Sequence, residues 1–194
     1  MDKHTTVLFN KPDLVLSTFT DSEGRETLKH YVPIEGIYSA GRLDYDSEGL
    51  LVITNDGGLI KILTDPIHHQ VKTYLAMVEG IPNTEQIQKL EKGIALKDFI
   101  TLPCKAMIIE PPQISNRRKP ITPHGPTFWI RIQIHEGKKH QIRQMTAAVG
   151  YPCLRLIRVA IGPIGIGDLL PGAWRELSKQ EIDQLKKVKN RSVV

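Results

Sequence analysis

Cysteine, aromatic side chains and long apolar runs are all scarce in this chain of 194 residues. Its two cysteines, Cys104 and Cys153, form no CxxC pair, which argues against a zinc or disulfide framework and favours reduced thiols. The apolar run at residues 50–53 is far shorter than the roughly 20 residues that a membrane span needs. The first residues also lack the apolar region of a secretory signal. These absences predict a cytoplasmic protein without a membrane partner.

Charge is distributed unevenly along the chain, although the net charge is only +5. Residues 1–97 hold 10 basic and 14 acidic side chains, a sum of −4, whereas residues 98–194 hold 16 and 7, a sum of +9. A basic half favours a polyanionic partner such as nucleic acid, but a surface that only confers solubility gives the same count. The apolar fraction of 40% and the charged fraction of 24% are those of a globular protein with one domain or two small lobes.

Short strands and short helices alternate along the chain without a regular βαβ rhythm, which predicts an α+β fold. Extended segments are expected at residues 5–9, 14–18, 36–40, 50–54, 71–79, 102–110, 128–135 and 154–161. Helices are expected at residues 27–31, 55–63, 87–92, 141–149 and 181–188. The proline-rich and basic segment 111–126 is expected to be a loop.

An acidic turn at residues 40–51 is the most unusual segment, with three carboxylates and Arg42 between two apolar strands. Acidic turns are common on protein surfaces, so a solvated turn is one explanation. The other is a functional site, because burial of Leu43 would draw Asp44 toward the interior and Arg42 could keep a carboxylate ionised. Residue types alone leave both explanations open.

The sequence contains no recognisable metal or cofactor motif. The acidic turn resembles the start of a calcium loop, but its twelfth position is Asn55 instead of a bidentate glutamate. His135 and His140 are five residues apart instead of the four that a zinc-protease helix requires. The glycine-rich segment 162–172 matches neither a P-loop nor a dinucleotide fingerprint. We therefore expect neither a metal nor a cofactor.

Two basic segments are candidate phosphate contacts. Residues 136–145 place cations at a turn that leads into a helix, and Lys139 and Arg143 are four residues apart, on one helix face. A solvated basic helix would have the same pattern. Arg117 and Arg118 lie in the proline-rich loop and are candidates for flexible phosphate contacts, or for an ordinary exposed loop.

Four segments in order resemble the signature blocks of RNA pseudouridine synthases of the RsuA branch. Residues 41–44 with 47–51 are similar to the block that carries the catalytic aspartate. The other three are residues 10–12 with 16–18, 72–74 with 78–80, and 136–145 with 150–158. The resemblance spans roughly residues 6–177, and four ordered blocks are far more specific than one.

This resemblance implies a mixed, mainly antiparallel sheet in two lobes with a central active-site cleft. It implies one catalytic domain over residues 1–194, without the amino-terminal S4-type domain of many relatives. The chain looks closest to the RluE type, which modifies large-subunit (23S) ribosomal RNA. The expected partner is ribosomal RNA with the target uridine in a single-stranded or distorted loop, either naked or in a pre-ribosomal particle. The protein is expected to be a monomer whose acidic and basic halves face each other across the cleft.

The implied reaction converts a uridine to pseudouridine without a cofactor. The family's essential aspartate corresponds to Asp44, which either attacks the sugar covalently or removes its 2′ proton. Arg143 corresponds to the cation that pairs with this aspartate, and Tyr74 to the aromatic residue that packs on the base. Leu156 or Leu154 is expected to close the apolar side of the pocket.

Four polar residues of the blocks are assigned to RNA binding or pocket support: Arg42, Lys11, Lys139 and Arg158. Lys138 and His140 of the last block, and Arg117 and Arg118 of the proline-rich loop, are assigned to RNA binding. Two other functions stay open. A non-catalytic RNA-binding ribosome assembly factor would use the same basic surface without needing Asp44. A glycosidase would pair Asp44 with Asp46 or Glu48 as its two carboxylates.

Overall fold

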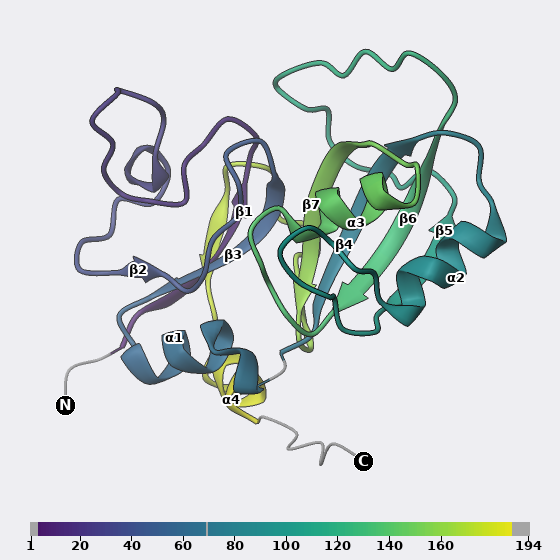
Figure 1. Cartoon of the computed structure of the whole chain (residues 1–194). Coiled ribbons are helices and arrows are strands. Elements are labelled where there is room, and N and C mark those ends of the chain that lie inside the picture. The colour runs from purple at the N-terminus through teal and green to yellow at the C-terminus, as the bar shows by residue number, and fades with distance from the viewer. Residues whose placement is uncertain (1–3, 69, 188–194) are drawn as a thin grey trace.

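The computed structural model describes residues 4–68 and 70–187, in which one mixed nine-stranded sheet runs through two lobes (Figure 1). The strands are β1 (Thr6–Lys11), β2 (Tyr38–Ser39), β3 (Glu48–Thr54), β4 (Lys72–Glu79), β5 (Lys105–Ile109), β6 (Thr127–Ile134), β7 (Cys153–Ile161), β8 (Ile164–Gly165) and β9 (Trp174–Glu176). The helices are α1 (Gly57–Thr64), α2 (Thr84–Lys92), α3 (Gln141–Ala148) and α4 (Lys179–Lys186), with 3-10 turns η1 (Leu28–His30) and η2 (Pro66–His68).

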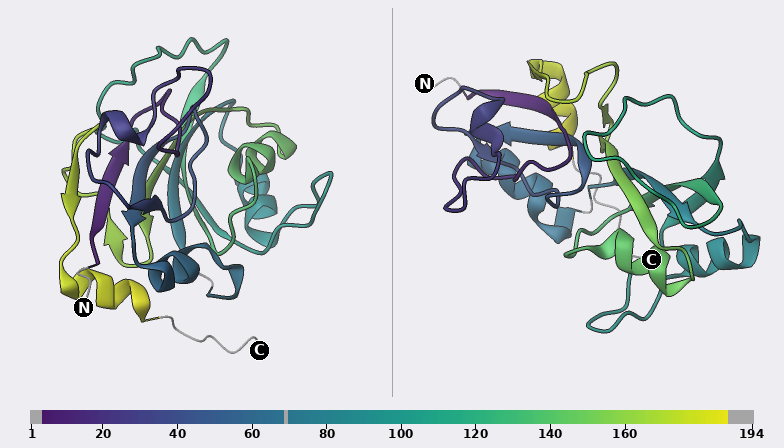
Figure 2. Two further views of the ribbon diagram at one scale, coloured as in Figure 1. Left: turned by 90° about the vertical axis from the view of Figure 1, so that its left-hand side faces the viewer. Right: turned by 90° about the horizontal axis from the view of Figure 1, so that it is seen from above.

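The order of the strands divides the sheet into the two lobes. The main path runs β5-β6-β4-β7-β3-β1-β9, with β2 on β3 and β8 on β7. The first lobe contains β1, β2, β3 and β9 with α1 and α4, and the second contains β4 to β7 with α2 and α3. The view from above in Figure 2 separates the two groups. All pairs of named strands are antiparallel except β3 with β7, which joins the lobes.

The junction between the lobes depends on one glycine. The parallel pairing of β3 with β7 consists of Glu48 opposite Ile157 and Gly49 opposite Arg158. Gly49 has φ +105°, and a Cβ atom there would lie 2.2 Å from the carbonyl oxygen of Arg158. Only glycine has both the left-handed conformation at low cost and the missing side chain that this approach needs.

In the first lobe both faces of the sheet are covered, which explains why β1 and β3 are buried along their whole length. Leu8 of β1 packs on one face with α1 and α4, whereas its neighbours Val7 and Phe9 pack on the other with the segment around η1. An ion pair of 2.6 Å between Lys186 and Asp56 ties α4 to the start of α1. Asp56 is also the N-cap of α1, where it accepts a hydrogen bond from the backbone of Leu59.

In the second lobe one large core lies between the sheet and two helices. Alternate residues of β4 and β6 point into it, among them Ala76 and Ile130, and they meet Leu90 of α2 and Met145 of α3. This period-two burial is what the alternation of apolar residues predicts for both strands. The core fixes α3 against the sheet, and the amino-terminal end of α3 therefore lies beside the first lobe.

The α+β fold and the cleft between two lobes are confirmed, but the expected split between the acidic and basic halves is wrong. Strand β4 belongs to the acidic half, yet it lies between β6 and β7; β9 and α4 belong to the basic half, yet they complete the first lobe. Strand pairing mixes the halves because neighbours in a sheet need not be neighbours in sequence. The extended segment expected at residues 14–18 forms only an isolated bridge, and β8 and β9 were not expected. The expected last helix reached Val188, which lies outside the described residues.

Within the described ranges, none of the helices has the length and apolarity to cross a membrane. Cys104 and Cys153 are both free thiols. Burial raises the pKa of each thiol to about 11, so both stay protonated near neutral pH and act as packing residues.

Candidate active site

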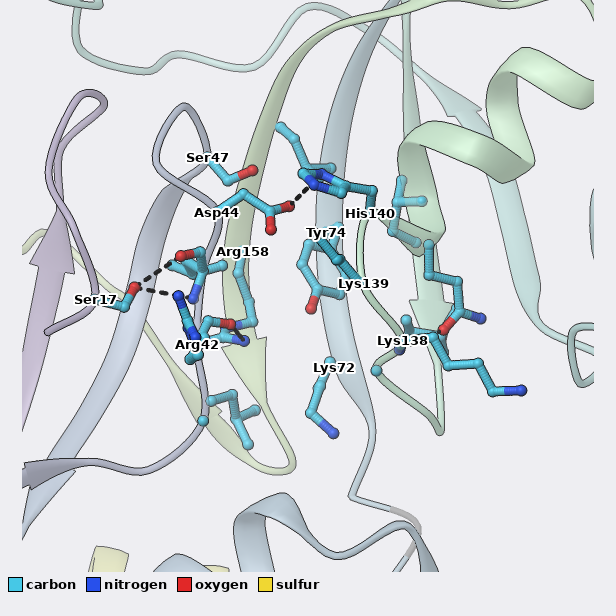
Figure 3. A pocket seen from close by; sticks show the side chains of 18 of the residues that line it. Ser17, Arg42, Asp44, Ser47, Lys72, Tyr74, Lys138, Lys139, His140 and Arg158 are labelled. Carbon is cyan, nitrogen blue, oxygen red and sulfur yellow. Dashed lines mark hydrogen bonds and ion pairs between the residues drawn. The ribbon is translucent and has the colours of Figure 1, made fainter. Parts of the chain in front are cut away.

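A cleft of about 680 Å³ lies between the two lobes (Figure 3). It is lined by the acidic turn of the first lobe and by β4, β7 and the turn before α3 from the second. Eight of the residues that the sequence singled out line it: Arg42, Asp44, Tyr74, Lys138, Lys139, His140, Leu156 and Arg158. Leu154 is not among the lining residues, so Leu156 is the leucine that closes the apolar side.

The acidic turn is held rigidly by its own backbone and by Ser17. The Ser17 hydroxyl donates to the carbonyl of Leu43 at 2.8 Å and accepts from the amide of Leu43 at 3.0 Å. The amide of Ser47 donates to the carbonyl of Asp44 at 3.0 Å, which closes the turn. Leu43 is buried, as the sequence suggested, so the following residue, Asp44, is presented at the wall of the cleft with its side chain 31% exposed.

Lys11 lies beneath the same turn and is completely buried. Its ammonium donates to the carbonyls of Pro12 at 2.9 Å, Val15 at 2.7 Å and Tyr45 at 3.4 Å. Burial lowers the pKa of Lys11 to about 7, against the opposing effect of Glu48 and other carboxylates. RNA binding is therefore the wrong one of the two roles expected for Lys11, because this buried side chain supports the turn from inside.

The carboxylate of Asp44 has a different partner from the one expected. Its Oδ2 lies 3.3 Å from Nδ1 of His140, which is at the amino-terminal end of α3. Arg143 instead places Nη2 at 2.9 Å from Oδ2 of Asp46, and its Nη1 donates to the carbonyl of Cys153 at 3.0 Å. The predicted Asp44–Arg143 ion pair is wrong because Arg143, in the first turn of α3, is directed toward Asp46 and the start of β7.

Tyr74 and Leu156 form the apolar side of the cleft. Tyr74 is 7% exposed, and it lies opposite Arg158 in the pairing of β4 with β7. Leu156 is two residues before Arg158, on the same face of β7. The exposed part of the tyrosine ring faces the cleft beneath Asp44 (Figure 3). A flat ring bound here would have an aromatic surface, an aliphatic one and a carboxylate around it.

Two cations lie deeper in the cleft. Arg158 is 3% exposed and donates from Nε to the carbonyl of Leu50 at 2.8 Å, so it connects β7 to β3. Lys72 is half-buried, and burial together with the charge of Arg158 lowers its pKa to about 8. Lys72 belongs to one of the four sequence blocks, but it was not predicted as a site residue. The signal was available, because Lys72 is two residues before Tyr74 on the same strand and so shares its face.

The proline-rich loop is anchored, and Arg117 is part of its anchor. Asp13 accepts hydrogen bonds from Nε of Arg117 at 3.1 Å and from the amides of Arg118 and Lys119 at 3.1 and 2.9 Å. Burial favours a higher pKa for Asp13, but these bonds outweigh it and lower the pKa. The predicted flexible phosphate contact is therefore wrong for Arg117, which is mostly buried, whereas Arg118 is exposed and paired with Glu26.

The sequence did not predict the buried ion pair between Glu48 and Arg155. Arg155 donates two hydrogen bonds to Glu48, of 2.9 and 2.8 Å, and a third to the carbonyl of Ser115 in the proline-rich loop. Arg117 lies 3.8 Å from the same carboxylate. Sequence spacing gave no signal, because 107 residues separate Glu48 from Arg155. The network fixes the acidic turn, β7 and the loop to one another.

The basic rim of the cleft belongs to the turn before α3. Lys138 and Lys139 are exposed, and the Lys138 ammonium lies 3.9 Å from the centroid of the Phe99 ring. Arg42 is exposed on the opposite wall. The cleft thus combines the carboxylate of Asp44 with an aromatic face and a cationic rim, which suits a nucleotide in a polyanion. The described residues include no group of three or more His, Cys, Asp or Glu side chains placed to hold a metal ion.

Comparisons with known proteins agree with this geometry. The protein family described as RNA pseudouridylate synthase matches residues 5–148. The chain is 47% identical over 179 residues to the "Ribosomal large subunit pseudouridine synthase E" of Vibrio parahaemolyticus, which covers 91% of this chain and 75% of that protein. A protein of the same name from Xanthomonas axonopodis pv. citri is 48% identical over 170 residues, or 85% and 90% of the two chains.

The fold has a counterpart among solved structures. One described as "Crystal structure of pseudouridylate synthase" superposes with a TM-score of 0.81 at 27% identity. The match covers 95% of this chain and 75% of that one.

Proposed function

Because the chain belongs to the RNA pseudouridylate synthase family, and within it to the RluE type of the RsuA branch, we propose that it isomerises one uridine of 23S ribosomal RNA to pseudouridine. The observation that carries this proposal is the position of Asp44, whose carboxylate faces the cleft above the ring of Tyr74. The relatives named for the large ribosomal subunit support the choice of RNA.

The reaction needs a carboxylate next to the ribose of the target. The bond from C1′ to N1 of uracil breaks, the base turns, and C5 bonds to C1′ while its hydrogen leaves as a proton and N1 gains one. Asp44 either attacks the sugar and leaves again, or removes and returns the 2′ proton. Both roles need an ionised, accessible side chain, and Asp44 is 31% exposed on a rigid turn.

The base has to leave the RNA stack to reach Asp44. Flipping a nucleotide costs a few kcal/mol, and least in a loop or distorted helix. Stacking on an aromatic side chain returns about 1–3 kcal/mol per base, and Tyr74 with Leu156 offers such a surface. We therefore propose a single-stranded or distorted segment as the target.

The rim supplies contacts for the RNA backbone. Lys138, Lys139 and Arg42 are exposed around the cleft, and Arg118 lies on the anchored loop. Lysine and arginine contacts to phosphate position a nucleic acid without reading its sequence. We propose that residues 1–194 act as one catalytic domain and a monomer, in the cytoplasm, on ribosomal RNA that is naked or part of a pre-ribosomal particle.

Replacement of Asp44 by asparagine tests this function directly. Asp44→Asn keeps the shape of the side chain but removes its charge, so release of tritium from RNA with 5-tritiated uridine should fall by at least about 100-fold. RNA binding, measured by filter retention, should change little. Asp98→Asn, an exposed residue outside the cleft, is the matched control. Full activity of Asp44→Asn would contradict the proposal and favour a non-catalytic RNA-binding assembly factor.

A further inference from the structure

His140 has an unusual backbone conformation for a residue with a side chain. Its φ of 53° and ψ of 21° are left-handed, and Leu14 is the other non-glycine residue with positive φ among the described residues. This conformation is unfavourable for residues with a Cβ atom, and it persists only where neighbouring contacts impose it.

Two glutamines hold the backbone of His140 in this left-handed conformation. Gln141 accepts a hydrogen bond from the amide of Lys138 at 3.0 Å through its side chain, while its own amide donates to the carbonyl of Lys138 at 3.2 Å. The side chain of Gln144 donates to the carbonyl of Lys139 at 3.1 Å, and its backbone amide donates to the carbonyl of His140 at 3.0 Å. Residues on both sides of His140 are thus fixed before α3 begins.

A buried carboxylate, that of Glu136, also holds the turn before α3 in place. Glu136 is 8% exposed and accepts hydrogen bonds from the side chain of Gln141 at 2.6 Å and from the amide of Leu102 at 2.8 Å. This connection ties the turn to the body of the second lobe. The backbone position of His140, from which its side chain projects, is therefore set by the fold of that lobe.

The result of this arrangement is one contact across the cleft. The imidazole Nδ1 lies 3.3 Å from Oδ2 of Asp44, while the other carboxylate oxygen points into the cleft (Figure 3). Arg143 contacts Asp46 and the carbonyl of Cys153 instead, so the histidine is the partner of Asp44.

We propose that Nδ1 of His140, which lies 3.3 Å from Oδ2 of Asp44, donates to that oxygen and makes His140 a positioning residue. It holds the carboxylate so that its free oxygen faces the ribose of the bound uridine. The inference rests on the proposed role of Asp44. It differs from RNA binding, the role that the basic segment by itself suggests, and the two roles affect different measurements. A positioning residue changes the rate of the bound complex, whereas a phosphate contact changes the affinity.

Three substitutions separate these roles without disturbing the backbone. Asparagine and aspartate tolerate the left-handed conformation better than most residues, and glycine adopts it freely. In His140→Asn the amide nitrogen is as many bonds from the backbone as Nδ1 and still donates. His140→Gly removes the donor, and His140→Asp places a second carboxylate opposite Asp44.

The rate of tritium release is measured in single turnover with the enzyme saturating, and RNA affinity is measured separately by filter retention. We expect His140→Asn to stay within about threefold of the unmodified protein and His140→Gly to lose about 10- to 100-fold, the effect of losing one hydrogen bond to a charged group. His140→Asp should lose at least as much as His140→Gly. Added imidazole should restore part of the rate of His140→Gly.

The matched control is His124→Asn, since His124 is 89% exposed beside Glu79 and outside the cleft. Equal rates at saturation for His140→Asn, His140→Gly and His140→Asp would overturn the proposal, and so would weaker RNA binding as their only defect. A loss in His140→Asn as large as in His140→Gly would also overturn it. None of these results would contradict the proposed function, which fails only if Asp44→Asn retains activity.

Discussion

Gly49 is the position where a single added carbon atom should do most damage to this fold. It lies in β3 one residue after Glu48, and it faces the backbone of Arg158 in the parallel pair that joins the lobes. We consider the substitution Gly49→Ala. Its Cβ would lie 2.2 Å from the carbonyl oxygen, 2.8 Å from the amide nitrogen and 3.0 Å from the carbonyl carbon of Arg158.

Two costs add at this position. Alanine at φ +105° has a conformational penalty of about 1–2 kcal/mol relative to glycine. The contact is with backbone, which cannot rotate away, so β3 and β7 must move apart and lose the hydrogen bonds of their short pairing. Overpacking of a tight contact costs about 1–3 kcal/mol. We expect a loss of about 2–5 kcal/mol in the free energy of unfolding.

Urea unfolding followed by circular dichroism measures this loss, with Gly24→Ala as the matched control. Gly24 also has positive φ, of +74°, but a Cβ there meets nothing within 4 Å, so only the conformational penalty of about 1–2 kcal/mol should appear. Tritium release should fall further in Gly49→Ala than stability alone explains, because Gly49 is itself part of the acidic turn that carries Asp44. Equal losses of stability in the two variants would refute the steric argument.

Two further predictions concern the buried charges behind the acidic turn. Burial lowers the pKa of Lys11 to about 7 in the fold, against 10.5 in the unfolded chain, so the unfolded chain binds more protons between these values. The free energy of unfolding should therefore rise with pH from about 7 upward. Urea unfolding at pH 6.5 and 8.5 should show a smaller rise in Lys11→Met than in the unmodified protein, and an equal rise would exclude Lys11 as its source. Glu48→Gln leaves the buried cation Arg155 without its carboxylate, while Arg117 keeps Asp13, and should cost about 3–5 kcal/mol in thermal or urea unfolding. Glu181→Gln, in an ion pair at the surface of α4, should cost less than about 1 kcal/mol, and similar losses in both would show that the inner pair is not a buried one.

Patterns that are local in sequence predicted most of the secondary structure correctly. The alternation in residues 128–135 corresponds to β6, and the helix expected at residues 87–92 is α2, which begins three residues earlier, after its N-cap at Asn83. These features depend on side-chain period and capping, which act over a few residues. The three-residue strand β9 was missed because it is defined by its pairing with β1, 165 or more residues away in the chain. Nothing within its own three residues marks it as a strand.

The candidate site was predicted at the level of motifs and corrected at the level of contacts. Asp44, Tyr74 and Leu156 line the cleft as expected, because the order of the blocks identified the family. RNA binding was expected for Lys11 because it is a polar member of a family block, and for Arg117 because it lies in a basic, proline-rich loop. Lys11 is buried and Arg117 is mostly buried, and each has a partner that is far away in sequence, Tyr45 for Lys11 and Asp13 for Arg117.

The sequence by itself determined the family and the α+β fold, and it identified Asp44 and Tyr74 as the residues for which we propose roles in the reaction. Those properties depend on residue types in a fixed order, which a single chain displays directly. Only the tertiary structure decided that His140 instead of Arg143 contacts Asp44, and that the strands of the acidic and basic halves are mixed in one sheet. The physical reason is that a hydrogen bond or an ion pair depends on a few ångströms of distance, which the packing of α3 and the pairing of β3 with β7 set across about a hundred residues of chain.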